Sequence, residues 1–176
     1  GSDKAYPFVT RSEMTSQMPS LKKVALKHAE YAESTMQELF PPEVLDKSLV
    51  LKATHLESAI LWNEGGKFSL QPLPKEAQVS PVFSIIAEDM DQDNCVDLLL
   101  MGNLYALKPE LGRLDANRGV FLKGLDDRRY EAVPSRASGL WLRGQVRDAE
   151  VIEINGKAHV VVARNQESLK IYELGE

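Results

Sequence analysis

The chain has few of the residues from which most catalytic and metal centres are built. It contains one cysteine, Cys95, and three histidines in 176 residues. A single cysteine excludes an intramolecular disulfide and a cysteine-based zinc site. The histidines, His28, His55 and His159, stand apart from any nucleophile motif, and no G-x-S-x-G, P-loop or G-x-G-x-x-G pattern occurs. We therefore expect a protein that is not an enzyme.

Long apolar runs and clusters of basic residues are also missing. No apolar stretch approaches the roughly 18 residues of a membrane-spanning helix, so no membrane span is expected. The 21 lysines and arginines are scattered and face 26 aspartates and glutamates, which gives a formal charge of −5. A nucleic-acid-binding surface needs clustered positive charge to release the counterions of the phosphates. Nucleic acid is therefore not an expected partner.

The first 48 residues have a helical pattern. Apolar residues recur at steps of three and four from Leu21 to Leu39, which predicts one amphipathic helix of about five turns that ends at Pro41. A shorter helical turn is expected near Thr10, because Thr10 and Glu13 have the spacing of a capping box. We expect this part, residues 1–48, to be a helical lead-in to the rest of the chain.

From residue 49 onward, short runs of β-forming residues alternate with turn residues. This pattern predicts a mainly β region of antiparallel strands. Two of the runs, 96–101 and 160–163, are continuously apolar, as expected of strands that are buried on both faces. The expected strands are 58–62, 68–70, 82–87, 96–101, 119–123, 130–133, 140–142, 149–154, 159–163 and 169–172.

A repeat with an offset of 62 residues organises this region. Three sets of residues share the offset: Phe68 with Tyr130 (130 − 68 = 62), Ala87-Glu88 with Ala149-Glu150, and Asn103 with Asn165. Each unit contains strands and turns in the order of a four-stranded antiparallel propeller blade. We therefore expect a partial β-propeller of two such blades, over residues 49–110 and 111–176. A chance match between two generic β-meanders is the alternative.

A carboxylate-rich loop, residues 89–97, connects two expected strands of the first unit. Its positions 1, 3, 5 and 9 are aspartates, and alternating side chains of a tightly curled loop converge on one point. Such carboxylates repel one another without a cation, so Ca²⁺ is the expected cofactor, and Mg²⁺ suits an all-protein cage less well. An acidic, solvated hairpin turn is the alternative. The expected ligands are Asp89, Asp91, Asp93, Asp97 and the main-chain carbonyl of Cys95.

The second unit has a different connection at the corresponding place. Asn155-Gly156 between two β-type runs is the strongest short-range signal for a two-residue type I′ hairpin. At the offset of 62 residues, Asp89 and Asp97 correspond to Val151 and His159, so the acidic loop is not repeated. The metal is therefore expected to be structural and to replace a tight turn.

These features resemble the FG-GAP and VCBS-repeat proteins, whose blades carry calcium loops of the form D-x-D-G-D-G-x-x-D. The four aspartates of the loop match the acidic positions, whereas Gln92 and Asn94 replace the two glycines. The stretches 80–82, 112–119 and 162–165 are similar to the C-terminal part of large extracellular proteins in which such repeats accompany an ASPIC/UnbV-type domain. The resemblance covers nearly the whole chain.

The resemblance implies a secreted or cell-surface protein used in adhesion, recognition or scaffolding, with calcium stabilising its blade loops. The expected function is a non-catalytic binding or scaffold module. Its expected partners are the remaining blades of a longer parent protein and an unknown protein or glycan ligand. Residues 1–4 lack the basic and apolar regions of a signal peptide, so the signal is expected upstream of them.

A glycan-acting enzyme or a carbohydrate-binding domain is the alternative function. Glycosidases use a pair of carboxylates, and aromatic side chains offer a flat apolar face for a sugar ring. The candidates for the carboxylate pair are Glu88, Asp89, Asp91, Asp126 and Asp127. The candidates for sugar stacking are Trp62 and Trp141, and those for an anion site are Arg136, Arg143 and Arg147.

Overall fold

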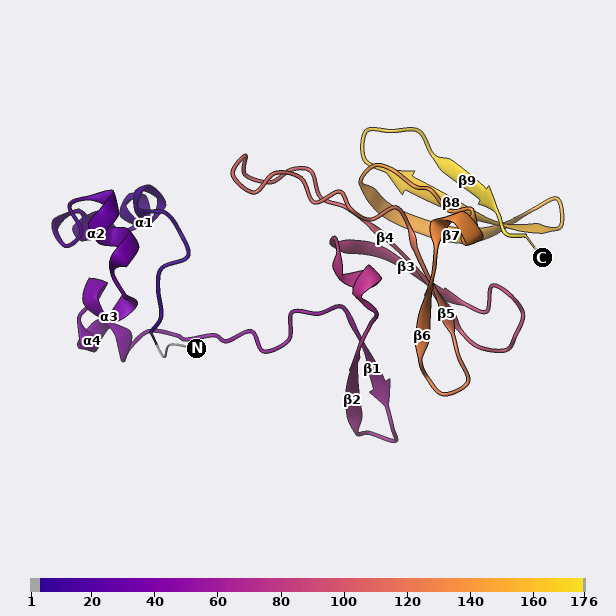
Figure 1. Ribbon diagram of the computed structural model, residues 1–176, viewed down its shortest axis with the longest axis horizontal. Coiled ribbons are helices and arrows are strands. Elements are labelled where there is room, and N and C mark those ends of the chain that lie inside the picture. Colours follow the sequence, from indigo (N-terminus) through magenta and orange to yellow (C-terminus); the bar gives the residue numbers. More distant parts are fainter. Residues whose placement is uncertain (1–3, 176) are drawn as a thin grey trace. The chain divides into compact units, whose positions relative to one another are not determined.

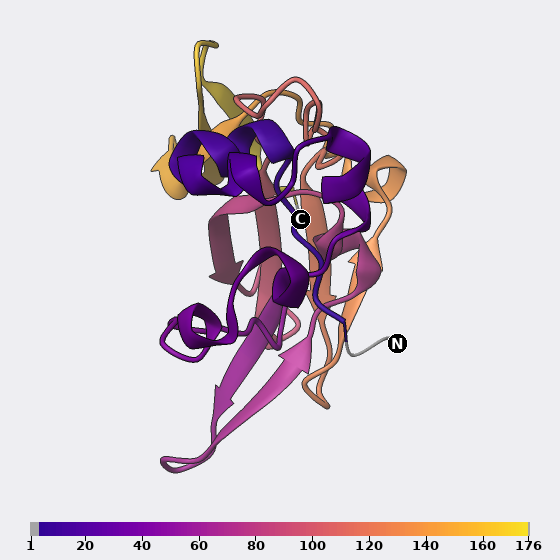
Figure 2. The same cartoon turned by 90° about the vertical axis from the view of Figure 1, so that its left-hand side faces the viewer.

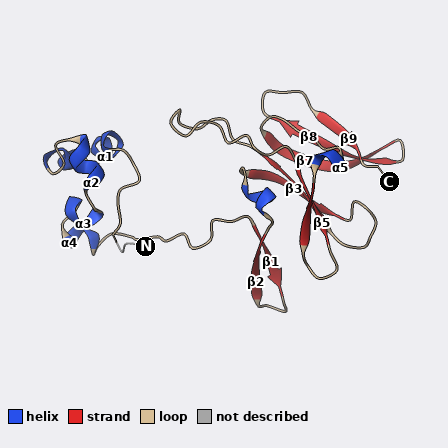
Figure 3. Cartoon of the chain, in the orientation of Figure 1, coloured by secondary structure: helices blue, strands red, loops and turns tan. Residues whose placement is uncertain are grey.

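The computed structural model describes residues 4–175 of the chain. The chain divides into two compact units, residues 1–54, which are helical, and residues 55–176, which are mainly β (Figures 1 and 3). In the described part, no helix is both long enough and apolar enough to cross a membrane. The expectation about a signal peptide rests mainly on residues 1–3, which lie outside the described residues.

The first unit consists of short helices, so the prediction of one helix of five turns is wrong. Figures 1 and 2 show them as separate coils. The elements are α1 (Arg11–Gln17), the 3₁₀ helix η1 (Pro19–Lys23), α2 (His28–Glu33), α3 (Met36–Leu39) and α4 (Pro42–Leu45). α3 ends directly before Pro41, as predicted, but the helical stretch does not end there, because α4 begins at Pro42.

Local hydrogen bonds explain why the helices are short. The predicted capping box is confirmed: the Glu13 carboxylate accepts the Thr10 N–H at 3.0 Å, and the Thr10 hydroxyl accepts the Glu13 N–H at 3.3 Å. A second such start occurs inside the apolar stripe, where Glu38 accepts the Thr35 N–H at 2.7 Å. Each new start requires an extended residue in front of it, and Ser34 and Thr35 are extended, with ψ of 135° and 164°.

The helical unit has a small core of its own. Three apolar residues of the stripe, Ala25, Tyr31 and Leu39, are buried together. The Tyr31 hydroxyl donates to the Val9 carbonyl at 3.0 Å, and the Arg11 Nε donates to the Ala25 carbonyl at 2.7 Å. The folded helices therefore bury part of the stripe against one another, and the apolar periodicity does not require a continuous helix.

In its described residues, the second unit contains nine strands in three antiparallel sheets. The strands are β1 (Ala59–Asn63), β2 (Phe68–Pro72), β3 (Val82–Glu88), β4 (Asp97–Gly102), β5 (Val120–Gly124), β6 (Tyr130–Val133), β7 (Val146–Ile154), β8 (Lys157–Arg164) and β9 (Lys170–Glu173). The sheet orders are β1-β2, β3-β4-β5-β6 and β7-β8-β9. Among the described residues, the expected run 140–142 forms no strand, and the sheets close into neither a barrel nor a ring.

The four-stranded sheet is covered on both faces. One face packs on the β7-β8-β9 sheet through a core that includes Ile86, Leu99 and Met101. The other face carries Leu98, Leu100 and Leu122 and packs on the β1-β2 hairpin and on a 3₁₀ turn over residues 75–78. All six residues of β4 are buried, as its continuous apolar run predicts.

The predicted boundary between the two units, after residue 110, does not separate the sheets. This prediction is therefore corrected. β4 and β5 pair with each other, with Leu98 opposite Leu122, so one sheet runs across residues 110 and 111. The two sequence units, β1 to β4 and β5 to β8, are similar in element order, but each contributes strands to two sheets. Two predicted four-stranded blades thus become sheets of two, four and three strands.

The hairpins β3-β4 and β7-β8 end in similar hydrogen bonds, but the predicted offset of 62 residues does not hold along their whole length. The Asn103 N–H donates to the Pro81 carbonyl, and the Asn165 N–H donates to the Gln145 carbonyl, at equivalent ends of their hairpins. Asn103 and Asn165 differ by 62, but Pro81 and Gln145 differ by 64. The match of Ala87-Glu88 with Ala149-Glu150 is therefore wrong by two residues, because the first hairpin is two residues longer: Val82 to Gly102 spans 20 and Val146 to Arg164 spans 18.

The predicted tight turn in the second hairpin is confirmed. Ile154 pairs with Lys157, and the two residues between them, Asn155 and Gly156, have φ of +53° and +78°. Positive φ at both central positions is the requirement of a type I′ turn. The second hairpin therefore closes by backbone geometry alone.

Replacing Gly156 by valine should destabilise the β unit by about 1–2 kcal/mol, because a β-branched residue is forced into the left-handed region. No atom lies within 4 Å of the added Cβ, so crowding contributes nothing. The free energy of unfolding in urea is the measurement. Ala158→Val, which adds the same side chain at an exposed strand position, is the control. Equal stability of both variants would contradict the turn assignment.

Candidate metal-binding loop

The candidate site is the connection between β3 and β4. β3 ends at Glu88 and β4 begins at Asp97, and these two residues face each other in the strand register. The intervening residues form the end of the β3-β4 hairpin. The strands therefore fix both ends of the loop.

Asp97 is the anchor of the loop and is fully buried, with 0% of its surface exposed. Its Oδ2 accepts the Met90 N–H at 3.0 Å, and its Oδ1 accepts the Gly124 N–H at 2.8 Å. One carboxylate thus connects the beginning of the loop with the end of β5. A buried carboxylate is stable only when its oxygens are paired, and both are paired here.

The other aspartates curl the loop around its own backbone. Asp89 accepts the N–H groups of Asp93 and Asn94 at 3.0 and 2.9 Å, and Asp93 accepts the Cys95 N–H at 2.9 Å. These bonds satisfy backbone donors that the β ladder leaves unpaired at a hairpin end. The aspartates therefore shape the loop through hydrogen bonds within the chain.

The two positions that the motif reserves for glycine adopt left-handed backbone conformations. Gln92 has φ of +60° and Asn94 has φ of +69°. Glycine adopts this region without strain, and asparagine tolerates it better than most residues. The loop therefore has the backbone that the calcium-loop motif requires, although neither residue is glycine.

Three of the expected ligands converge. One carboxylate oxygen each from Asp89, Asp91 and Asp97 lies within 4.8 Å of the others. Oxygens bound to one calcium ion at about 2.3–2.6 Å can be separated by up to about 5 Å, so this spacing fits a shared cation. Asp93 does not belong to this group. The main chain of Cys95 donates a hydrogen bond from its N–H to Asp93. The arrangement can hold a metal ion on three of the five predicted ligands.

Lys123 is the residue of this site that the sequence reasoning missed. Its ammonium group contacts the Asp91 carboxylate and lies 2.8 Å from Oδ2 of Asp93. The hydrogen bond from Lys123 holds the pKa of Asp93 below its usual range, and the two carboxylates, Asp91 first, raise the pKa of Lys123. The signal in the sequence was its position at the end of the expected strand 119–123, but only the strand order places it beside the loop.

The Cys95 side chain points to a different partner. Its thiol donates to Oδ1 of Asp126 at 3.3 Å, and this bond, with the nearby carboxylates, raises the pKa of the Cys95 thiol to about 11. A thiol with a raised pKa stays protonated at neutral pH and is a poor nucleophile and a poor metal ligand. Any contribution of Cys95 to a metal site is therefore expected from its main chain, as predicted.

The carboxylates and aromatic residues of the alternative function are engaged in separate contacts. Asp126 accepts the Cys95 thiol, and Asp127 pairs with Arg129 at 2.5 Å. Trp62 donates its indole N–H to Gln71 at 2.7 Å.

The three arginine candidates for an anion site each have a different position or a different contact in the fold. Arg147 bonds the Gln145 amide at 2.9 Å and stacks on the Phe83 ring. Arg136 lies in the short helix α5 (Ser135–Ser138), and the Arg143 carbonyl accepts a bond from Arg164 at 3.0 Å.

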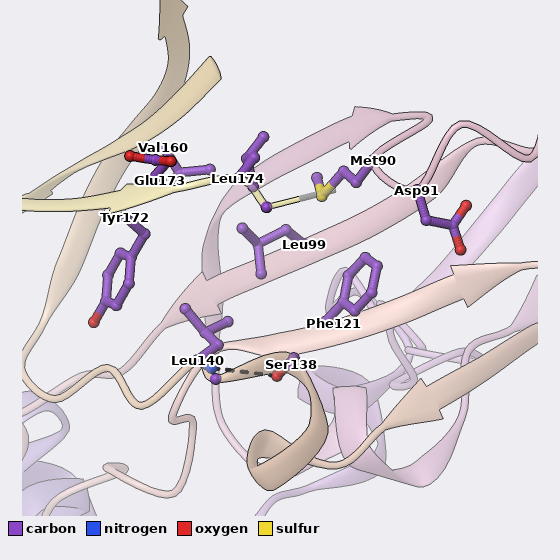
Figure 4. Close-up of a pocket in the computed structure, with 12 residues that line it drawn as sticks. Met90, Asp91, Leu99, Phe121, Ser138, Leu140, Val160, Tyr172, Glu173 and Leu174 are labelled. Carbon is purple, nitrogen blue, oxygen red and sulfur yellow. Dashed lines mark hydrogen bonds between the residues drawn. The ribbon is translucent and has the colours of Figure 1, made fainter. Parts of the chain in front are cut away.

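An apolar cavity lies beside the acidic loop. It has a volume of about 410 Å³ and lies between the two larger sheets, with Leu99, Phe121, Leu140 and Val160 among its lining residues (Figure 4). Asp91 is at its edge, and its carboxylate points away from the apolar side chains. The cavity therefore presents an apolar wall and no converging set of polar groups.

Comparison with protein-family models, with curated proteins and with solved structures finds no match to this chain. The resemblance drawn from the loop motif and the repeat therefore stays a prediction.

Proposed function

We propose that this chain is a non-catalytic, calcium-stabilised binding or scaffold module from a larger extracellular or cell-surface protein of the FG-GAP/VCBS-repeat type. The observation that carries the proposal is the convergence of Asp89, Asp91 and Asp97 in a loop whose two left-handed positions coincide with the glycines of the calcium motif. The left-handed backbone positions and the convergence of three carboxylates together support the proposal.

The arrangement of the sheets supports a blade-like architecture. β3 to β6 form a four-stranded antiparallel meander in sequential order, the composition of one complete blade. Its partners on either face correspond, by the repeat, to the last two strands of a preceding blade and the first three of a following one. In this proposal the chain contains parts of three consecutive blades of a propeller, and other parts of the parent protein supply the rest.

Calcium in this loop would act on structure and not on chemistry. An ion held by Asp97 on β4 and by Asp89 and Asp91 on the loop neutralises carboxylates that repel one another. It would also cross-link the loop to the strand that carries Asp97, which in turn bonds the end of β5. Binding of a protein or glycan partner would then use surfaces that this stiffened hairpin end supports.

Calcium should raise the melting temperature of the β unit. An ion that binds only the folded state stabilises it by about 2.7 kcal/mol at a hundred-fold excess over Kd, which corresponds to a shift of roughly 10 °C. The measurement is thermal unfolding followed by circular dichroism, after dialysis against chelator and with calcium added back. Asp91→Asn should abolish the shift, because it removes one converging carboxylate.

Asp127→Asn is the matched control, since Asp127 is an exposed carboxylate of the β5–β6 turn outside the loop. It should keep the full calcium shift. A wild-type melting curve that calcium and chelator leave unmoved would refute the calcium site. A shift that survives in Asp91→Asn would place the ion elsewhere in the chain.

A further inference from the structure

The positive charge of Lys123 lies beside the carboxylates of the acidic loop, where the calcium motif would hold a metal ion. The residue lies on β5, and its ammonium group contacts Asp91 and Asp93. All three side chains are about one-third exposed, at 36%, 37% and 34%, so the contact lies in the loop and not on an open surface. The chain thus supplies a cation of its own to these two carboxylates.

The equivalent strand position of the other sheet also carries a charge that pairs with its hairpin end. Leu98 faces Leu122 in the first sheet, and Val160 faces Tyr172 in the second, with 160 − 98 = 62. The next position along the third strand is therefore Lys123 in one sheet and Glu173 in the other.

The second sheet has the same contact with the charges reversed. Glu173 pairs with Lys157 and lies 3.8 Å from Nε2 of His159, the residue that corresponds to Asp97. In one sheet a lysine contacts carboxylates of the hairpin end, and in the other a glutamate contacts a lysine of the hairpin end. The position of Lys123 beside the loop is thus a repeated feature of the architecture and not an isolated surface pair.

A divalent ion and the lysine need the same ligand. Asp91 is one of the three converging carboxylates, and it is also the first partner of the Lys123 ammonium group. Two cations that share one carboxylate lie a few ångströms apart and repel each other strongly. Binding of the ion at Asp91 therefore requires the lysine to leave it.

We infer that Lys123 is a tethered cation that neutralises the loop when no divalent ion is bound and that competes with the ion for Asp91, so that it sets the affinity of the site. This inference rests on the proposed calcium site. It explains how the loop can fold without metal despite its four aspartates. It also implies that metal-free and metal-bound forms differ in the position of this side chain.

The test is a calorimetric calcium titration of the full chain and of Lys123→Gln after removal of metal. Lys123→Gln should bind calcium roughly three- to tenfold more tightly than the wild type, because no partly exposed ion pair has to be broken. Lys123→Arg, which keeps the charge, should bind like the wild type. Arg128→Gln removes an exposed ion pair, with Glu64, that involves no residue of the loop, and it should leave calcium affinity unchanged.

A second measurement separates competition from simple damage to the fold. In chelator, Lys123→Gln should melt at a lower temperature than the wild type, since its loop carboxylates lack their counter-charge, and calcium should reverse the difference. Calcium binding of equal or lower affinity in Lys123→Gln would overturn the inference and leave the calcium site intact. Absence of binding in both proteins would overturn the calcium site and, with it, the competition. Binding by Lys123→Gln alone would support the inference.

Discussion

Replacing Asp97 by alanine lowers the free energy of unfolding of the β unit by about 3–5 kcal/mol, the size expected when a buried charged acceptor of two hydrogen bonds is removed. The carboxylate is fully buried and accepts the N–H groups of Met90 and Gly124. Without it, two donors near the hairpin end lose their partner, and β5 loses its connection to the loop. The loss occurs without any metal, because these bonds are within the chain.

The measurement is urea unfolding in the presence of chelator, which removes any contribution of a bound ion. Asp93→Ala is the matched control, because Asp93 belongs to the same loop but is partly exposed and bonds to Lys123 and to the Cys95 N–H. It should lower the urea midpoint much less than Asp97→Ala does, because an exposed pair contributes little to stability. If the two variants unfold at the same urea concentration, Asp97 is not the anchor described here.

The strands were predictable because each depends on a local pattern. Nine of the ten expected β-type runs form strands, and their turns contain the residues that turn chemistry requires, such as Asn155-Gly156. The exception, Leu140 to Leu142, is apolar because Leu140 and Leu142 fill the core between the larger sheets, not because it pairs with a strand. A short apolar run is expected both for a buried irregular segment and for a buried strand, so the sequence pattern does not distinguish them.

The grouping of strands into sheets was not predictable from the repeat. A repeat fixes the period but not where each unit begins, so a boundary can fall between any two strands of a continuous series. The boundary placed after residue 110 separates β4 from β5, which the structure pairs. The pairing depends on contacts such as Leu98 with Leu122. The run 103–119 between these strands contains turn residues such as Pro109 and Gly112, but it is too long to indicate a hairpin by its turn type.

In the helical unit, periodicity identified the helical residues but not where the helices are interrupted. The signal for one interruption was present, because Thr35 and Glu38 have the same spacing as the capping pair Thr10 and Glu13. The apolar stripe across that point favoured a continuous helix. A stripe at helical spacing is preserved when short helices fold back on a shared core, so the stripe alone cannot distinguish the two arrangements.

The site was predictable in its acidic residues and not in its basic one. The aspartates are close in sequence, and their spacing alone predicted that they would converge, which the structure confirms for Asp89, Asp91 and Asp97. Lys123 comes 26 residues after Asp97 in the sequence (123 − 97 = 26). It lies beside the loop only because β4 pairs with β5. Contacts that depend on strand order are outside the reach of a local motif.

The same strand order brings together a buried polar network between the two larger sheets. Asn103 is 1% exposed, and its side chain makes four hydrogen bonds. Its amide NH₂ donates to the carbonyls of Asn117 and Gly144 at 2.8 and 3.0 Å, and its Oδ1 accepts the Asn117 N–H at 3.0 Å and the Ser80 hydroxyl at 2.9 Å. One side chain thus connects the end of β4 with residues that precede three other strands: Ser80 before β3, Asn117 before β5 and Gly144 before β7.

Asn103→Ala should therefore destabilise the β unit by about 3–5 kcal/mol, because it leaves several buried polar groups without partners in one network. The repeat offers a matched control in Asn165, the equivalent residue of the second hairpin, which is exposed. Asn165→Ala should change stability by less than about 0.5 kcal/mol, the usual range for surface substitutions. Asn103 has φ of +86°, so Asn103→Gly removes any backbone strain of the alanine variant and isolates the loss of the side chain. Stability of Asn103→Gly close to that of the wild type in urea unfolding would show that the sheets are held together by their apolar core without this network.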